Sequence, residues 1–157
     1  MLQNLKQFFD RSILPAARGQ GENTEHALQV ATAALLFEVM RMDGELKDAE
    51  QHAMTTTIRK RFELTAEETA TLLSLAKEEA EGATDYYQFT TLINKNYTPA
   101  QKEQVVEQMW QVAAADHAID RFERTLVHKV ADLLHVPRPR QIAARERALH
   151  TARQSNK

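Results

Sequence analysis

Two stretches of the chain, FEVMRMDGELKDAE at residues 37–50 and WQVAAADHAIDRFE at residues 110–123, follow one pattern that decides the fold. Aligned without a gap, they share an aromatic residue, a valine, an aspartate, an aliphatic residue three positions after the aspartate and a glutamate seven positions after it. Each stretch predicts the end of one helix, a tight turn and the start of another. A helical unit that occurs twice indicates a fold with two pseudo-symmetric halves.

The helices beside these turns can be traced from apolar spacing. Residues 24–42 are apolar around so wide an arc that the pattern predicts a central, buried helix. Thr98 followed by Pro99 is a strong helix start and predicts the equivalent helix of the second half. The repeat is therefore predicted to cover residues 24–64 and 97–136. The residues expected to be almost fully buried are Leu35, Val39, Trp110 and Val112.

The other segments also predict helices. Residues 2–13 form a short amphipathic pattern, which is expected to dock onto the rest of the protein. Thr65 and Glu68 have the spacing of a capping box, which predicts a helix that Gly82 ends. A shorter helix is expected to open at residues 84–87, and a basic one to cover residues 138–153. The prediction is a single all-α domain over residues 1–157, with about seven to eight helices.

Composition agrees with an all-α fold and excludes several kinds of site. The 157 residues include only four glycines and four prolines, and strong helix formers dominate. The absence of cysteine excludes disulfides, thiolate metal sites and thiol catalysis. No apolar run approaches the ~20 residues that cross a bilayer, and charge interrupts the first residues where a signal peptide would be apolar. We therefore expect a cytoplasmic protein.

The formal net charge of −2 conceals a basic C-terminal segment. Residues 138–157 contain one acidic residue, Glu146, and six basic residues: Arg138, Arg140, Arg145, Arg147, Arg153 and Lys157. Such a segment can contact a protein partner, an anionic surface or the rest of the chain, or it can be a solvated last helix. Nucleic acid is disfavoured because no aromatic residues are interleaved to stack on bases. A membrane-surface role for the first helix is disfavoured because its polar face holds few cations.

The turns of the repeat are acidic, and we refer to them as the two acidic corners. Hard divalent cations bind clusters of carboxylate and carbonyl oxygens, so a pseudo-twofold axis that brought the corners together would create a metal site. The candidate ligands are Asp43, Glu50, Asp116 and Glu123, with Glu45 and Asp120 as secondary candidates. His117 would add a nitrogen ligand and favour a transition metal.

Helix capping is the alternative explanation of the acidic corners. Asp120 and Glu123 have capping-box spacing, and an acidic residue in a first helical turn is favoured by the macrodipole. Lys47 occupies the position of Asp120 in the first copy, so capping does not account for both copies. An aspartate at the C-terminal end of a helix opposes the dipole and needs turn geometry, a positive partner or a bound cation.

These residues carry a resemblance to the TerB family, which is linked to tellurite resistance; a similar domain occurs at the N-terminus of the membrane-anchored co-chaperone DjlA. The similarity covers most of residues 24–136. The resemblance implies an all-helical domain with two pseudo-symmetric halves and acidic residues proposed to chelate a metal ion. Those positions correspond here to Asp43, Glu50, Asp116 and Glu123. His117 stands where the first copy has Gly44, which weakens an equal role for both corners.

No catalytic motif supports an enzyme. The four glycines form no phosphate-binding loop, and neither a nucleophile elbow nor a His-Glu-x-x-His pair is present. We therefore expect a non-enzymatic accessory domain acting in stress response through a cation, a protein partner or both. The alternative is a purely structural interaction module whose acidic corners only cap helices.

Overall fold

The computed structural model describes residues 2–14, 24–43, 48–82, 87–115 and 121–155. These residues form eight α-helices and one π-helical turn and contain no strand, which confirms the all-α prediction. The elements are α1 (Leu2–Phe8), η1 (Phe9–Ile13), α3 (Thr24–Asp43), α4 (Asp48–Arg61), α5 (Ala66–Glu81), α6 (Gln88–Asn96), α7 (Pro99–Ala115), α8 (Arg121–Leu133) and α9 (Arg138–Ser155).

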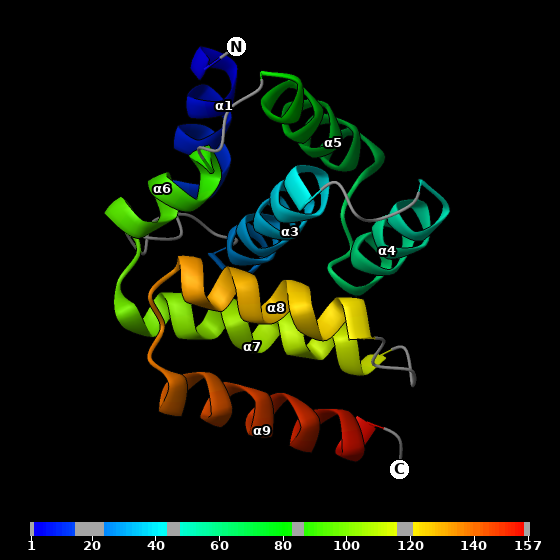
Figure 1. Ribbon diagram of the computed structural model, residues 1–157, viewed down its shortest axis with the longest axis vertical. Helices are drawn as coiled ribbons and strands as arrows, with labels where there is room; N and C mark the ends of the chain where they lie inside the picture. Colours follow the sequence, from blue (N-terminus) through cyan, green and yellow to red (C-terminus); the bar gives the residue numbers. More distant parts are fainter. Residues whose placement is uncertain (1, 15–23, 44–47, 83–86, 116–120, 156–157) are drawn as a thin grey trace.

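Helix α3 is the centre of the fold (Figure 1). It contacts η1, α4, α5, α6, α7 and α8, and every residue from Val30 to Met40 is buried. A helix surrounded on all sides can bury its whole circumference only if nearly all its side chains are apolar. Thr32 and Glu38 are the exceptions within that buried stretch, so each needs hydrogen-bond partners.

The two predicted halves pack as the duplication requires. Helices α3 and α4 contact each other, as do α7 and α8, and the long helices α3 and α7 lie against each other. The second helix of each pair also reaches the long helix of the other pair, α4 to α7 and α8 to α3. This exchange of contacts is the arrangement expected around a pseudo-twofold axis between α3 and α7.

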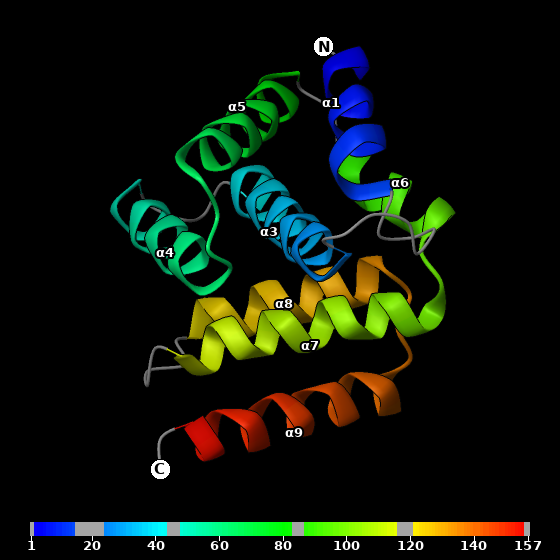
Figure 2. The ribbon, with the colours of Figure 1, turned by 180° about the vertical axis from the view of Figure 1, so that it is seen from behind.

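The repeat extends one helix further than the sequence pattern indicated. Helix α5 follows α4 and packs on α3, while α9 follows α8 and packs on α7 (Figure 2). The connections into these third helices have the same backbone bonds: Leu64 N–H donates to the Arg59 carbonyl at 3.0 Å, and Val136 N–H donates to the Ala131 carbonyl at 3.1 Å. Each connection also holds a left-handed residue, Glu63 at φ 53° or His135 at φ 58°.

The two helix starts predicted from threonine are confirmed, whereas the shorter helix predicted to open at residues 84–87 begins at Gln88; residues 84–86 lie outside the described part of the chain. Thr65 and Glu68 form the predicted capping box at α5, with Thr65 Oγ1 accepting from Glu68 N and Glu68 Oε1 accepting from Thr65 N. Thr98 and Gln101 make the same reciprocal pair before α7, at 2.8 and 3.2 Å. These pairs satisfy donors that a helix N-terminus leaves unbonded.

The predicted core residues are buried, from 0% exposure for Leu35 and Val39 to 2% for Trp110 and 9% for Val112. The N-terminal segment docks as expected, because Phe9 and Ile13 are buried and η1 contacts α3. None of the described helices is both long and apolar enough to span a bilayer.

Candidate functional site

The described helix ends beside the two acidic corners correspond between the two halves. Asp43 is the last residue of α3, and Glu50 and Glu123 are the third residues of α4 and α8. Helix α7 ends at Ala115, directly before Asp116. Glu45, Asp116, His117 and Asp120 lie outside the described residues, as do the side chains of Asp43, Glu50 and Glu123. The predicted ligand set therefore remains a prediction.

Elsewhere, the described side chains bring together no group of three His, Asp or Glu residues that would hold a metal ion. A cavity of about 20 Å³ lies between α3, α4, α7 and α8, and it is lined mainly by apolar residues such as Leu36, Met109 and Val127. A larger hollow of about 450 Å³ lies between the N-terminal segment and α5, with Arg11, Ser74 and Glu78 on its walls. Neither space holds a nucleophile and base in hydrogen-bond contact.

The basic helix α9 is paired with an acidic face of α7. Arg147 donates to Glu103 at 2.8 Å and also bonds to Glu107, while Arg140 lies 3.9 Å from Glu103. The Glu103 and Glu107 carboxylates raise the pKa of the Arg147 guanidinium. Two of the six basic residues of the C-terminal segment, Arg140 and Arg147, therefore face charge of opposite sign within the same chain.

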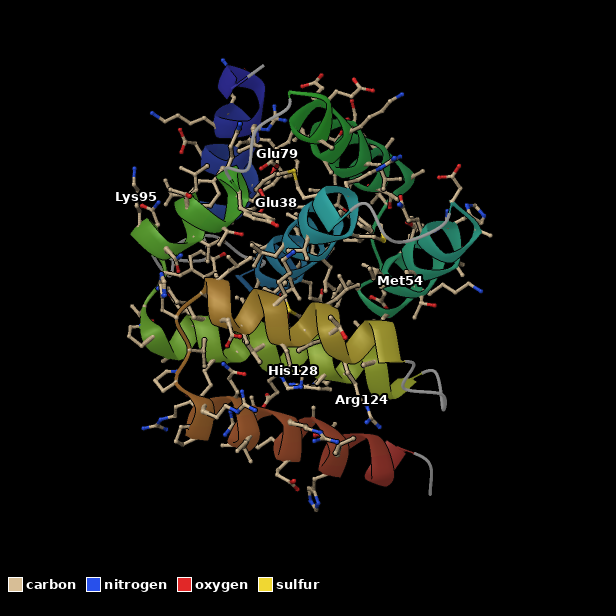
Figure 3. The ribbon with its side chains drawn as sticks, viewed as in Figure 1. Glu38, Met54, Glu79, Lys95, Arg124 and His128 are labelled. Atoms are coloured by element: carbon tan, nitrogen blue, oxygen red, sulfur yellow. The ribbon has the colours of Figure 1, made fainter. Side chains whose placement is uncertain are left out.

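Arg145 packs over Trp110, the one tryptophan of the chain. Its guanidinium carbon lies 5.2 Å from the centre of the indole ring, and the ring of His128 meets the indole edge-on with centroids 5.5 Å apart. Figure 3 shows His128 and Arg124 extending from α8 toward α9. The last of the four predicted anion-binding residues, Arg138, is exposed at the start of α9.

The unexpected polar feature is a pair of buried glutamates, Glu38 on α3 and Glu79 on α5, which we call the buried glutamate pair (Figure 3). Glu38 Oε2 accepts from Phe89 N at 2.7 Å, and its Oε1 accepts from Thr90 N at 3.2 Å and from Thr90 Oγ1 at 2.7 Å. Glu79 Oε1 accepts from Gln88 N at 2.8 Å. Two helices of the first repeat thus bind the start of α6.

The pair perturbs the titration of Glu38. Burial and then the neighbouring Glu79 carboxyl raise the pKa of Glu38 well above its ordinary value, and the bonds from Thr90 and Phe89 oppose this shift. Sequence reasoning missed the pair. Its one signal was Glu38, the only charged residue between Val30 and Met40 in a helix that is predicted to be buried; nothing local pointed to Glu79.

Comparison with protein families identifies the chain. The family model described as "Tellurite resistance protein TerB" matches residues 29–146, which include both acidic corners and most of the two three-helix repeats. Comparisons with curated proteins and with solved structures give no match. Because the matched region is most of the sequence, the chain belongs to the TerB family, as its resemblance to that family implied.

Proposed function

We propose that this TerB-family chain is a non-catalytic accessory domain in stress response, and that its acidic corners bind a divalent cation. The observation that carries the proposal is the equivalence of the corners within the repeat. Asp43 is the last residue of α3, and Asp116 is the residue directly after α7. The third residue of the next helix is a glutamate in both halves, Glu50 in α4 and Glu123 in α8. Two carboxylates at one helix–helix turn are oxygen ligands of the type that hard cations prefer.

The helix dipole supports this proposal. The C-terminal end of a helix carries a partial negative charge, so an aspartate there is destabilising unless positive charge is nearby. The last turn of α7 contains no basic residue, which leaves Asp116 without a cation from its own helix. The last turn of α3, which ends at Asp43, contains one basic residue, Arg41. A bound cation would supply the missing positive charge at both corners.

The experiment is thermal unfolding of metal-free protein, purified without a histidine tag, with Ca²⁺, Mg²⁺, Mn²⁺ or Zn²⁺ added in turn. An ion that binds only the folded state stabilises it by ~2.7 kcal/mol at a hundredfold excess over its Kd. We expect at least one ion to raise the Tm, and we expect Asp43→Asn combined with Asp116→Asn to abolish the rise. Asp10→Asn, at an exposed position on η1, is the matched control and should leave the rise intact.

Metal analysis of the same protein distinguishes two arrangements. Two ions per chain indicate that each corner binds its own, whereas one ion that is lost both from Asp43→Asn alone and from Asp116→Asn alone indicates a site shared by Asp43, Glu50, Asp116 and Glu123. A flat Tm with all four ions would refute cation binding. The acidic residues of the corners would then only cap helices. In that case Asp120→Ala would lower the free energy of unfolding by ~1 kcal/mol, and metal ions would not change the stability of the protein.

A second candidate function is a protein interaction module without metal. The observation that favours it is Ile142 on α9, which is 56% exposed and is the one large exposed hydrophobic side chain among the described residues. It lies one helical turn from the exposed Arg138 and Glu146, so the surface combines an apolar centre with charged neighbours. Ile142→Ala should then weaken partner binding without changing the Tm, while metal ions should have no effect.

A further inference from the structure

Helix α6 connects the two three-helix repeats, and its own sequence does not cap its first turn. The residue before it, Tyr87, provides no side-chain hydrogen bond to the free N–H groups. The buried glutamate pair binds those groups instead: Glu79 accepts from the first residue of α6, and Glu38 accepts from the second and third. Both carboxyl groups come from α3 and α5, so the cap is also the attachment of α6 to the first repeat.

The pair leaves one oxygen without a partner. Glu38 is 0% exposed and Glu79 is 4% exposed, yet Glu79 Oε2 is buried and has no hydrogen bond to any other described donor. Every other carboxylate oxygen of the pair accepts at least one bond from α6. Two adjacent ionised carboxylates would repel each other strongly where water is excluded.

Among the described residues, no lysine or arginine contributes to the pKa shift of Glu38 and so compensates this charge. The segments around the pair carry Lys6, Asp10 and Arg11 on α1 and η1, Arg41 on α3, Lys77, Glu78 and Glu81 on α5, Tyr87 and Lys95 at α6, and Lys129 on α8. All of these side chains are at least partly exposed, and Lys129 lies over the Tyr87 ring at 5.7 Å. Burial, Glu79, Thr90 and Phe89 account for the shifted pKa of Glu38, and no lysine or arginine contributes.

We infer that Glu38 and Glu79 hold one proton between them, and that this shared proton fastens the connecting helix α6 to the first repeat. The proton lies between the unpartnered oxygen, Glu79 Oε2, and the Glu38 carboxylate, because every other oxygen of the pair already accepts a bond from α6. The pair then holds one negative charge rather than two. A single charge complements the partial positive charge at the start of α6 without repulsion between the carboxyl groups.

The attachment extends to the N-terminal segment through α6. The ring of Phe89 meets the ring of Phe8 edge-on at 6.4 Å, and Tyr97, directly after α6, donates its hydroxyl to the Ile13 carbonyl at 3.2 Å. Loss of the shared proton would therefore loosen α6 together with α1 and η1. The site is distinct from the acidic corners, so this inference does not depend on cation binding.

The sign of the pH dependence follows from the direction of the shift. The folded pair retains a proton that the unfolded chain releases at the ordinary glutamate pKa, because folding raises the pKa of Glu38, with which Glu79 shares that proton. The resulting stability is complete below that ordinary pKa and is lost as the pH rises through the raised value. Within this range the folding equilibrium constant falls by up to tenfold per pH unit.

The decisive variant is Glu79→Gln. Its amide oxygen can accept from Gln88 N, and its amide nitrogen can donate permanently to Glu38, which reproduces the protonated form without a titrating proton. We expect urea unfolding of this variant to lack the loss of stability with rising pH that the wild type shows. Glu78→Gln, one residue away on the same helix and partly exposed, is the matched control and should keep the wild-type pH dependence.

Glu38→Gln should behave differently from Glu79→Gln. Both Glu38 oxygens accept from α6, so an amide nitrogen there would face a backbone or hydroxyl donor. We expect faster hydrogen exchange at the Phe89 and Thr90 amides in this variant at every pH. If Glu38→Gln and Glu79→Gln changed amide hydrogen exchange and the pH dependence of stability in the same way, the assigned proton position would be wrong.

Infrared spectroscopy of the wild type tests the proton without any mutation. A protonated buried carboxyl should give a carboxylic C=O band at a pH well above the ordinary glutamate pKa, and Glu79→Gln should remove it. Absence of the band in the wild type, or a pH dependence of stability that Glu79→Gln leaves unchanged, would refute the shared proton. A Glu79→Gln protein that fails to fold leaves the wild-type band as the deciding result.

Discussion

Replacing Trp110 with alanine tests the packing of the second repeat, because this residue joins α7, α8 and α9. Its ring is 2% exposed, with the Arg145 guanidinium over its face and His128 at its edge. Truncation would remove the largest side chain of the core and leave Arg145 without its aromatic partner. Both effects should lower the free energy of unfolding.

The size of the effect can be worked from the burial of the ring. A buried tryptophan covers roughly 150–250 Å², which corresponds to about 4–6 kcal/mol at ~25 cal/mol per Å². The alanine methyl group recovers a small part of this, and measured Trp→Ala costs in protein cores are ~3–5 kcal/mol. The lost cation–π contact adds ~0.5–1 kcal/mol at a partly exposed site. We therefore expect Trp110→Ala to cost ~3–5 kcal/mol, toward the upper end of that range.

Urea unfolding followed by far-ultraviolet circular dichroism is the suitable assay, because the variant lacks the only tryptophan and hence the tryptophan fluorescence signal. Ile142→Ala is the control on α9: at 56% exposure it should change stability by no more than ~0.5 kcal/mol. A cost below about 1 kcal/mol for Trp110→Ala would refute the burial argument. It would also make the Trp110 face a candidate for partner binding.

Two further predictions concern the helix starts and the basic helix. Thr65→Ala and Thr98→Ala each remove one member of a reciprocal cap, so each should cost ~1 kcal/mol in urea unfolding, and no loss in either would show that the caps are not formed in solution. Glu103→Gln combined with Glu107→Gln removes both carboxylate partners of Arg147, so this double variant should bind anionic vesicles more strongly at low salt than the wild type does. Its binding should weaken as the salt concentration rises to the physiological level. If the double variant does not bind vesicles at low salt, α9 is a solvated helix.

The helices and the core were predictable because the signals that specify them are local. Apolar spacing located α3 and α7, and the Thr65 and Thr98 caps located the starts of α5 and α7. These signals depend on residues within a few positions of each other, so they can be read without knowing the tertiary structure. The burial of Trp110 followed from the same spacing.

Features that depend on contacts between distant segments were not predictable in this way. Helices α5 and α9 were both predicted, but their membership of the repeat was missed because they differ in charge, although their connections share the same backbone bonds. The buried glutamate pair was missed because Glu38 and Glu79 meet only after α3 and α5 pack together. The pairing of Arg147 with Glu103 likewise joins residues from two helices, so composition alone could not decide whether α9 contacts a partner, an anionic surface or the rest of the chain.

Comparison of aligned positions in the two repeats distinguishes residues that act in one repeat from residues that have the same role in both. Glu38 aligns with Gln111, whose amide oxygen accepts from Arg61 at 3.0 Å instead of binding the start of a helix. The carboxylate is needed only in the first repeat, because only that repeat is followed by the connecting helix α6. The acidic corners differ in this respect, since an aspartate and a glutamate stand at the same places in both copies although the residues between them, such as Gly44 and His117, differ. A position that serves its neighbours changes when those neighbours change, so the shared aspartate and glutamate support the proposed ligand of both corners over local capping.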